Sequence, residues 1–136
     1  LDLLFENKKI DFKKIIRMYE MKTASLFSFS CVAPFIIAKK NIKEINIVND
    51  FGNLFGIIFQ ITDDILDQDQ GFGALGKTPG KDKAQGKSTL LSILNKEKLK
   101  KFCLKEIKRF SYRNKSFLLN NPILNKLIYT NLEKLD

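Results

Sequence analysis

Four of the nine aspartates in this otherwise basic chain lie close together, at Asp63, Asp64, Asp67 and Asp69. On a helix, Asp63 and Asp67 share one face, with Gln60 one turn earlier. Carboxylates at this spacing repel each other, and at the C-terminal end of an apolar helix they also oppose the helix dipole. A hard cation would compensate, because Mg²⁺ typically binds one or two carboxylates together with phosphate oxygens and water. The spacing favours a magnesium site over its alternative, an acidic helix end exposed to solvent.

Four lysines follow the aspartates at close intervals: Lys77, Lys81, Lys83 and Lys87. Ammonium groups that face metal-binding carboxylates across a gap would hold a diphosphate from two sides. A solvated loop is the alternative, and it applies more to Lys81 and Lys83 than to the other two. The segment from Gly71 to Lys87 is therefore predicted to be a loop that contributes cations to a diphosphate site.

Three better-known motifs fit this region poorly. An EF-hand that began at Asp67 would need Gly and Glu where the sequence has Phe72 and Thr78. The segment GFGALGKT, residues 71–78, matches both GxGxxG and the Walker A pattern. Those patterns require a buried strand before them and a helix after them, whereas DDILDQDQ precedes this segment and Pro79-Gly80 follows it. Calcium, dinucleotide and P-loop sites are therefore disfavoured.

The formal charge of +9 is the balance of 24 basic and 15 acidic residues, and of the basic residues only Arg17, Arg109 and Arg113 are arginines. Bidentate phosphate recognition would favour arginine, so a basic nucleic-acid-binding module remains the weaker alternative. The chain contains no histidine, which excludes histidine base catalysis. Cys31 and Cys103 are predicted to be buried free thiols in a reducing compartment.

Apolar spacing predicts an all-α fold, with helical periodicity throughout and only two valines. One or two helices are expected over residues 12–40, and the uncharged stretch 24–38 is expected to be a buried helix because it is too short to span a membrane. Residues 41–49 are predicted to connect to a helix that Asn49 and Asp50 cap and that runs into the aspartates.

Two further helices are predicted after the lysine segment. Leu99, Phe102, Cys103, Ile107 and Phe110 recur at helical spacing opposite a lysine face. Pro122 suits the first turn of a final helix that carries Leu124, Leu127, Ile128 and Leu135. No domain boundary is visible between these elements, so residues 1–136 are predicted to belong to one domain.

The segments FQITDDILD and LGKTPGKDKAQGKST closely resemble the second Asp-rich region of trans-isoprenyl diphosphate synthases of the farnesyl and geranylgeranyl type. MKTASLF, residues 21–27, resembles the KTG segment of that family, with Ala24 in place of the usual glycine. The resemblance implies a helical bundle of the isoprenoid synthase type, of which this chain would be the C-terminal portion. The first Asp-rich motif would lie upstream of Leu1, and the chain alone is expected to be inactive.

The resemblance also assigns roles to residues. It implies that Asp63 binds Mg²⁺, or Mn²⁺ in its place, with help from Asp64 and Asp67. It implies that the allylic diphosphate is held by Lys22 and Lys77 and supported by Lys87. Thr23, Gln60 and the Lys22 carbonyl would stabilise the allylic cation, and Phe59 would line the isopentenyl diphosphate side.

The reaction implied is the condensation of an allylic diphosphate with isopentenyl diphosphate, which gives farnesyl or geranylgeranyl diphosphate. The resemblance further implies a cytoplasmic homodimer that neither binds nucleic acid nor inserts stably into membranes. A non-catalytic regulatory subunit of the same family is the alternative. The intact Asp63, Asp64 and Asp67 argue against it, because regulatory copies usually lose these aspartates.

Overall fold

The computed structural model describes residues 11–73 and 89–135, and within these ranges every regular element is a helix. The predicted all-α class is confirmed. In chain order the elements are α2 (Phe12–Tyr19), the π-helical segment η1 (Glu20–Ala24), α3 (Ser25–Ile37), α4 (Ile42–Gly73), the 3₁₀ turn η2 (Leu90–Ser92), α6 (Lys96–Arg113), α7 (Lys115–Leu119) and α8 (Pro122–Glu133).

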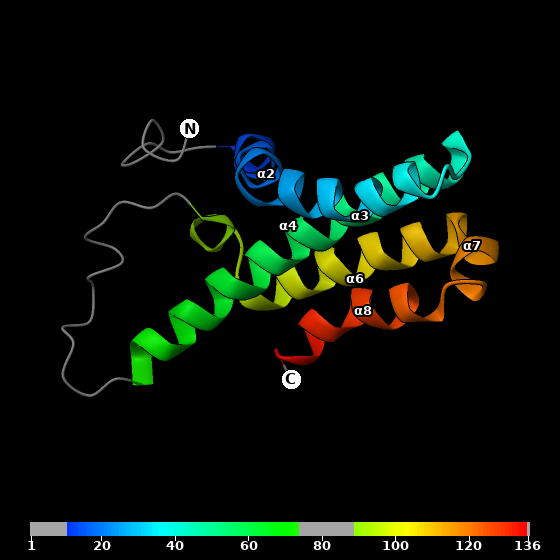
Figure 1. The fold of residues 1–136 in the computed structure, drawn as a ribbon. Coiled ribbons are helices and arrows are strands. Elements are labelled where there is room, and N and C mark those ends of the chain that lie inside the picture. The colour runs from blue at the N-terminus through cyan, green and yellow to red at the C-terminus, as the bar shows by residue number, and fades with distance from the viewer. Residues whose placement is uncertain (1–10, 74–88, 136) are drawn as a thin grey trace.

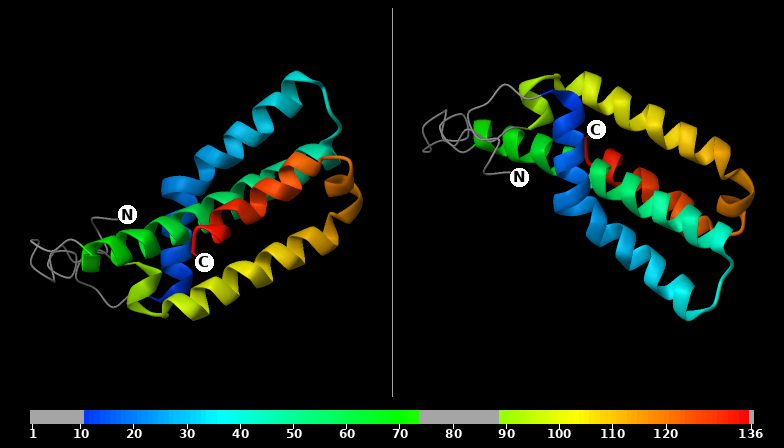
Figure 2. Two further views of the ribbon diagram at one scale, coloured as in Figure 1. Left: turned by 90° about the horizontal axis from the view of Figure 1, so that it is seen from below. Right: turned by 90° about the horizontal axis from the view of Figure 1, so that it is seen from above.

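The long helix α4 is the centre of the bundle (Figure 1). α3 and α6 both run antiparallel to it, on opposite sides, and α8 returns alongside α4 and α6 (Figure 2). α2 crosses α4 and reaches the start of α6, where the rings of Phe12 and Phe102 meet edge to face with centroids 5.3 Å apart. Every other long helix is therefore positioned by its contact with α4.

The core lies between α4, α6 and α8, and in α6 it contains residues that helical spacing predicted. Ile58, Ile61 and Ile65 of α4 are fully buried, as are Leu99 and Ile107 of α6. In α8 the predicted Ile128 is fully buried, whereas Leu127 is partly exposed. The core thus follows the apolar face of each helix, as expected when burial of apolar surface drives packing.

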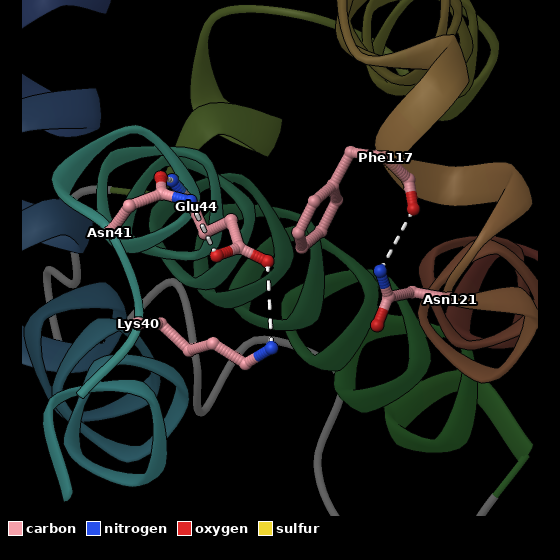
Figure 3. Close-up of polar contacts among 5 residues, drawn as sticks. All are labelled: Lys40, Asn41, Glu44, Phe117 and Asn121. Carbon is pink, nitrogen blue, oxygen red and sulfur yellow. Dashed lines mark hydrogen bonds and ion pairs between the residues drawn. The ribbon is translucent and has the colours of Figure 1, made fainter. Parts of the chain in front are cut away.

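The two helices predicted after the lysine segment are confirmed. α6 begins after Asn95, whose side chain accepts a hydrogen bond from the Lys98 backbone N–H at 3.0 Å and so caps the helix. α8 has Pro122 in its first turn, as predicted. In front of it, the Asn121 amide donates to the Phe117 carbonyl at 2.8 Å (Figure 3).

The predicted connection over residues 41–49 was wrong, because α4 begins at Ile42. The Asn41 side chain accepts from the Glu44 backbone N–H at 2.9 Å, and the Glu44 carboxylate accepts from the Asn41 amide at 2.7 Å. Lys40 lies 3.8 Å from the same carboxylate (Figure 3). This reciprocal capping starts the helix eight residues before the predicted cap. At the other end, α4 continues to Gly73 and so overruns the predicted loop start.

The prediction that residues 24–38 form a buried helix was also wrong in its burial. Within α3 only Ser28 is buried, and Leu26 and Phe29 are each 70% exposed. α3 is apolar on several sides, but it packs mainly against α4. No helix in the described ranges is long and apolar enough to cross a membrane.

Both cysteines are free thiols, as predicted. Cys103 is fully buried in the core, and burial raises the pKa of its thiol to about 12. The predicted burial was wrong for Cys31, which is only half-buried because it lies on α3, and partial burial raises the pKa of its thiol as well.

Small residues allow α3 and α4 to approach each other closely. A Cβ atom added at Gly52 would lie 2.5 Å from the Ser28 Cα, and one added at Gly56 would lie 2.5 Å from the Ala24 Cα. Ala24 and Gly56 are both buried, so the backbones meet where neither helix carries a large side chain. Phe27 packs beside this contact against Phe55, with ring centroids 5.1 Å apart.

Replacing Gly56 with alanine should therefore destabilise the protein. Alanine favours a helix by about 1 kcal/mol over glycine, yet the added methyl group collides with the Ala24 backbone. We expect a net loss of about 1–3 kcal/mol in the free energy of unfolding, typical of an overpacked site. Urea denaturation followed by circular dichroism measures it.

Asn46→Ala is the matched control, because Asn46 is exposed on the same helix. Its free energy of unfolding should stay within about 0.5 kcal/mol of the parent value or rise. A Gly56→Ala protein as stable as the control would contradict the close backbone contact.

Candidate functional site

The turn that carries Lys22 and Thr23 is π-helical and joins α2 to α3 without a break. The Ser25 backbone N–H donates to the Glu20 carbonyl five residues earlier, and the Ser25 hydroxyl donates to the same oxygen at 2.8 Å. A π turn contains one residue more than an α turn, so it changes which side chains face the neighbouring helix. Such turns often occur at functional sites.

The consequence of the π turn is that Tyr19, Thr23 and Ala24 all face α4. Ala24 meets Gly56, as described above, and Thr23 reaches the next turn of α4. The Thr23 hydroxyl donates to the Gln60 side-chain oxygen at 2.7 Å. Two segments singled out in the sequence, 37 residues apart, are therefore in direct contact.

Gln60 continues this contact along α4 to the aspartates. Its amide nitrogen donates to the Asp64 Oδ1 oxygen at 3.0 Å, across one helical turn. The structure thus brings together Thr23, Gln60 and Asp64 in one line of hydrogen bonds. Lys22 also acts on this line, because its charge lowers the pKa of Asp64.

Tyr19 is a member of the site that the sequence did not identify as functional. Its hydroxyl donates to the Asp64 Oδ2 oxygen and accepts a hydrogen bond from the Leu90 backbone N–H at 3.1 Å. Tyr19 belongs to none of the motifs singled out in the sequence. Its position one helical turn before Thr23 is the signal that could have indicated a role beside the site.

The Asp64 carboxylate is partly buried, and both of its oxygens accept hydrogen bonds. Its pKa is raised above the ordinary value of 3.8 mainly because burial disfavours the charged form. The hydrogen bonds from Tyr19 and Gln60 lower the pKa, Asp63 raises it, and Lys22 lowers it. The burial effect is the largest, so the net shift is upward.

Asp63 and Asp67 differ from Asp64, because both side chains are exposed. They lie four residues apart on α4, as predicted, and α4 is helical across both positions. Within the described residues, no group of three or more metal-ligating side chains lies close enough to hold an ion. Two exposed carboxylates nevertheless suit Mg²⁺, because this ion prefers oxygen ligands and completes its coordination with substrate phosphates and water.

The remaining predicted site residues divide into two groups. Phe59 lies on α4 beside the site, 36% exposed, and its ring contacts that of Phe27 with centroids 5.2 Å apart. Lys77 and Lys87, the predicted diphosphate ligands, lie outside the described residues, together with Lys81 and Lys83.

Comparison with known proteins places this arrangement in a family. Residues 1–116 match the family model of polyprenyl synthetase. A geranylgeranyl diphosphate synthase of Sulfolobus acidocaldarius is 36% identical over 132 residues, which cover 93% of this chain and 40% of that protein. A farnesyl diphosphate synthase of Bacillus subtilis is 35% identical over 96 residues, covering 71% of this chain and 32% of that protein.

The fold has a solved counterpart. The structure of a geranyltransferase from Helicobacter pylori matches with a TM-score of 0.70 at 22% identity, covering 99% of this chain and 43% of that one. The chain therefore spans less than half the length of these relatives. The family model covers most of this chain, and the bundle matches the structural neighbour throughout. The chain belongs to the polyprenyl synthetase family.

Proposed function

We propose that this chain supplies the wall that binds the diphosphate in a prenyltransferase, which joins an allylic diphosphate to isopentenyl diphosphate. The observation that carries the proposal is the line of hydrogen bonds from Thr23 through Gln60 to Asp64. These bonds hold Lys22 and Thr23 beside the aspartates. The groups proposed to bind the leaving diphosphate therefore lie next to the groups proposed to face the reacting carbon. The farnesyl and geranylgeranyl diphosphate synthases among the relatives support this substrate class.

In this proposal the outer carboxylates, Asp63 and Asp67, hold Mg²⁺ with the substrate phosphates. Both are exposed and share one face of α4, whereas the oxygens of Asp64 already accept hydrogen bonds from the protein. When bound, Mg²⁺ would neutralise charge on the diphosphate and so favour its departure. Asp64 would support the two outer carboxylates from behind.

Lys22 is exposed in the π turn, close enough to Asp64 for its charge to lower the pKa of that carboxylate, and we assign it to the allylic diphosphate. An ammonium group there stabilises the negative charge that grows on the departing group. Lys77 and Lys87 would add further positive charge from the segment that follows α4. This arrangement needs no histidine, because its contribution is electrostatic.

Thr23 and Gln60 are assigned to the allylic cation. The Thr23 hydroxyl donates its proton to Gln60, so the oxygen lone pairs of Thr23 are turned away from that contact. Together with the Lys22 carbonyl, these oxygens would present partial negative charge to the cation without acting as nucleophiles. Phe59 would close the isopentenyl side with an apolar surface.

The complete reaction requires more than this chain. A single wall of carboxylates binds one side of a diphosphate, and the chain spans 40% or less of the curated relatives named above. We assign residues 1–136 to one part of a single prenyl synthase domain, which the shared core of α4, α6 and α8 supports. The exposed apolar side chains of α3 offer surface for the rest of that domain and for the predicted homodimer.

Asp63→Ala tests the metal role directly. In the complete protein that carries this chain, we expect prenyl transfer to fall by about a hundredfold or more, because several kcal/mol of charge stabilisation would depend on the bound metal. Asp50→Ala is the control, since Asp50 is another exposed acid of α4. Turnover of radiolabelled isopentenyl diphosphate measures both, and near-normal turnover in Asp63→Ala would exclude the proposed role.

The raised pKa of Asp64 predicts how stability changes with pH in metal-free protein. A folded pKa above the unfolded value of 3.8 means that the folded state binds the proton more tightly. Tighter proton binding by Asp64 stabilises the folded state. This contribution is complete below pH 3.8 and is lost as the pH rises through the folded-state pKa of Asp64. Asp64→Asn cannot ionise, so near neutral pH it should be more stable than the parent protein.

The gain in stability of Asp64→Asn over the parent protein should disappear below the unfolded-state pKa of Asp64. Thermal denaturation in the presence of a chelator, at a series of pH values, measures it. Asp50→Asn serves as the control for removing a surface carboxylate. If Asp64→Asn were less stable than the parent at every pH, the hydrogen bonds to Asp64 would outweigh its burial.

A further inference from the structure

The Tyr19 hydroxyl connects three separate elements at one point. Tyr19 ends α2 and is only 2% exposed. Its hydroxyl donates to Asp64 of α4 and accepts from the backbone N–H of Leu90, which begins η2. Leu90 is itself buried and is the second described residue after the gap at 74–88.

This contact exceeds what a buried tyrosine needs. One hydrogen-bond partner suffices to satisfy a buried phenol, and a backbone carbonyl would serve. Here the Tyr19 hydroxyl donates its proton to the carboxylate of Asp64. Its oxygen also accepts a hydrogen bond from the backbone N–H of Leu90, 71 residues away in the sequence. A hydrogen bond to a charged group is among the stronger ones in proteins.

The Asp64 carboxylate is consequently fixed from two directions. Gln60 donates to Oδ1 and Tyr19 to Oδ2, so rotation about the side chain would break at least one bond. Asp63 and Asp67, its neighbours on α4, are exposed. The inner carboxylate is thereby held in place before any ligand arrives, which lowers the ordering cost of binding.

We infer that Tyr19 is the positioning residue of the aspartate cluster, holding Asp64 and anchoring the chain at Leu90 beside it. The inference rests on the proposed function, because the cluster is taken to bind Mg²⁺ and diphosphate. Tyr19 touches neither ligand in this view. It acts through Asp64, by keeping the negative charge behind Asp63 and Asp67 in a fixed place.

Tyr19→Phe in the complete protein tests this inference, since it removes the hydroxyl and keeps the ring in the core. We expect the dissociation constant for inorganic diphosphate in the presence of Mg²⁺ to rise about tenfold, as loss of a hydrogen bond to a charged group implies. Isothermal titration calorimetry measures it without requiring turnover. The half-saturating Mg²⁺ concentration for prenyl transfer should rise by a similar factor.

A double-mutant cycle with Asp64→Asn separates positioning from general destabilisation. If Tyr19 acts through Asp64, the double variant should bind Mg²⁺–diphosphate no more weakly than Asp64→Asn alone. Ser28→Ala is the matched structural control, because Ser28 donates to Asn49 at 2.5 Å between α3 and α4. It should lower the melting temperature and leave Mg²⁺–diphosphate affinity unchanged.

Each of these measurements either supports or overturns the positioning role of Tyr19. Additive effects of Tyr19→Phe and Asp64→Asn, or a loss of affinity in Ser28→Ala equal to that in Tyr19→Phe, would overturn the inference. If Tyr19→Phe does not fold, unchanged Mg²⁺–diphosphate affinity in Asp64→Asn would overturn it as well. A parent protein that binds Mg²⁺–diphosphate but transfers no prenyl group would refute the proposed function alone, and one that does not bind it would refute both.

Discussion

The close contact between η1–α3 and α4 is the constraint on which the rest of this structure depends. Gly52 and Gly56 leave no side chain on the face of α4 that meets Ser28 and Ala24, so the two backbones nearly touch. Interaxial distances depend on the side chains at the contact, so small residues there bring the helices closer together and shorten the span that a short side chain such as threonine must bridge. The small-residue contact therefore places Thr23 within hydrogen-bond distance of Gln60.

The π turn and the glycines act together. The turn changes the register between α2 and α3, and the glycines remove the side chains that the new register would otherwise meet. Ala24, at the position where the sequence resemblance implied glycine, is accommodated because Gly56 opposes it. The local irregularity of one helix is thus stabilised by the composition of its neighbour.

The aspartates have two different environments on one helix. Asp64 faces the packed side of α4, where burial raises its pKa and where Tyr19 and Gln60 hold it. Asp63 and Asp67 face outward. Three chemically identical side chains within five positions are thus divided into an inner carboxylate, which accepts hydrogen bonds from the protein, and an outer pair, which is free to bind a cation. On α6, by contrast, Lys98, Lys101 and Lys105 are exposed and follow the helical repeat away from the core.

The sequence by itself determined the helical class, the core face of α6, and the placement of Asp63 and Asp67 on one face of a helix. These follow from the 3.6-residue period, which is a local property of the chain. It did not determine where α4 begins, because Asn41 and Asn49 both suit a cap and only the Asn41–Glu44 pairing distinguishes them. It also did not determine that α3 would be exposed on its outer side, since burial depends on what packs there.

Tertiary structure alone decided that Tyr19, Asp64 and Leu90 meet. Their hydrogen bonds join residues 45 and 71 positions apart, and no local pattern encodes contacts over such separations. The division of the aspartates into inner and outer groups has the same origin, because neighbouring residues on a helix point in different directions and only the surrounding helices define which direction is inside. The residue types that could bind a metal are thus written in the sequence, whereas their burial and their hydrogen-bond partners arise when α2 and α3 pack on α4.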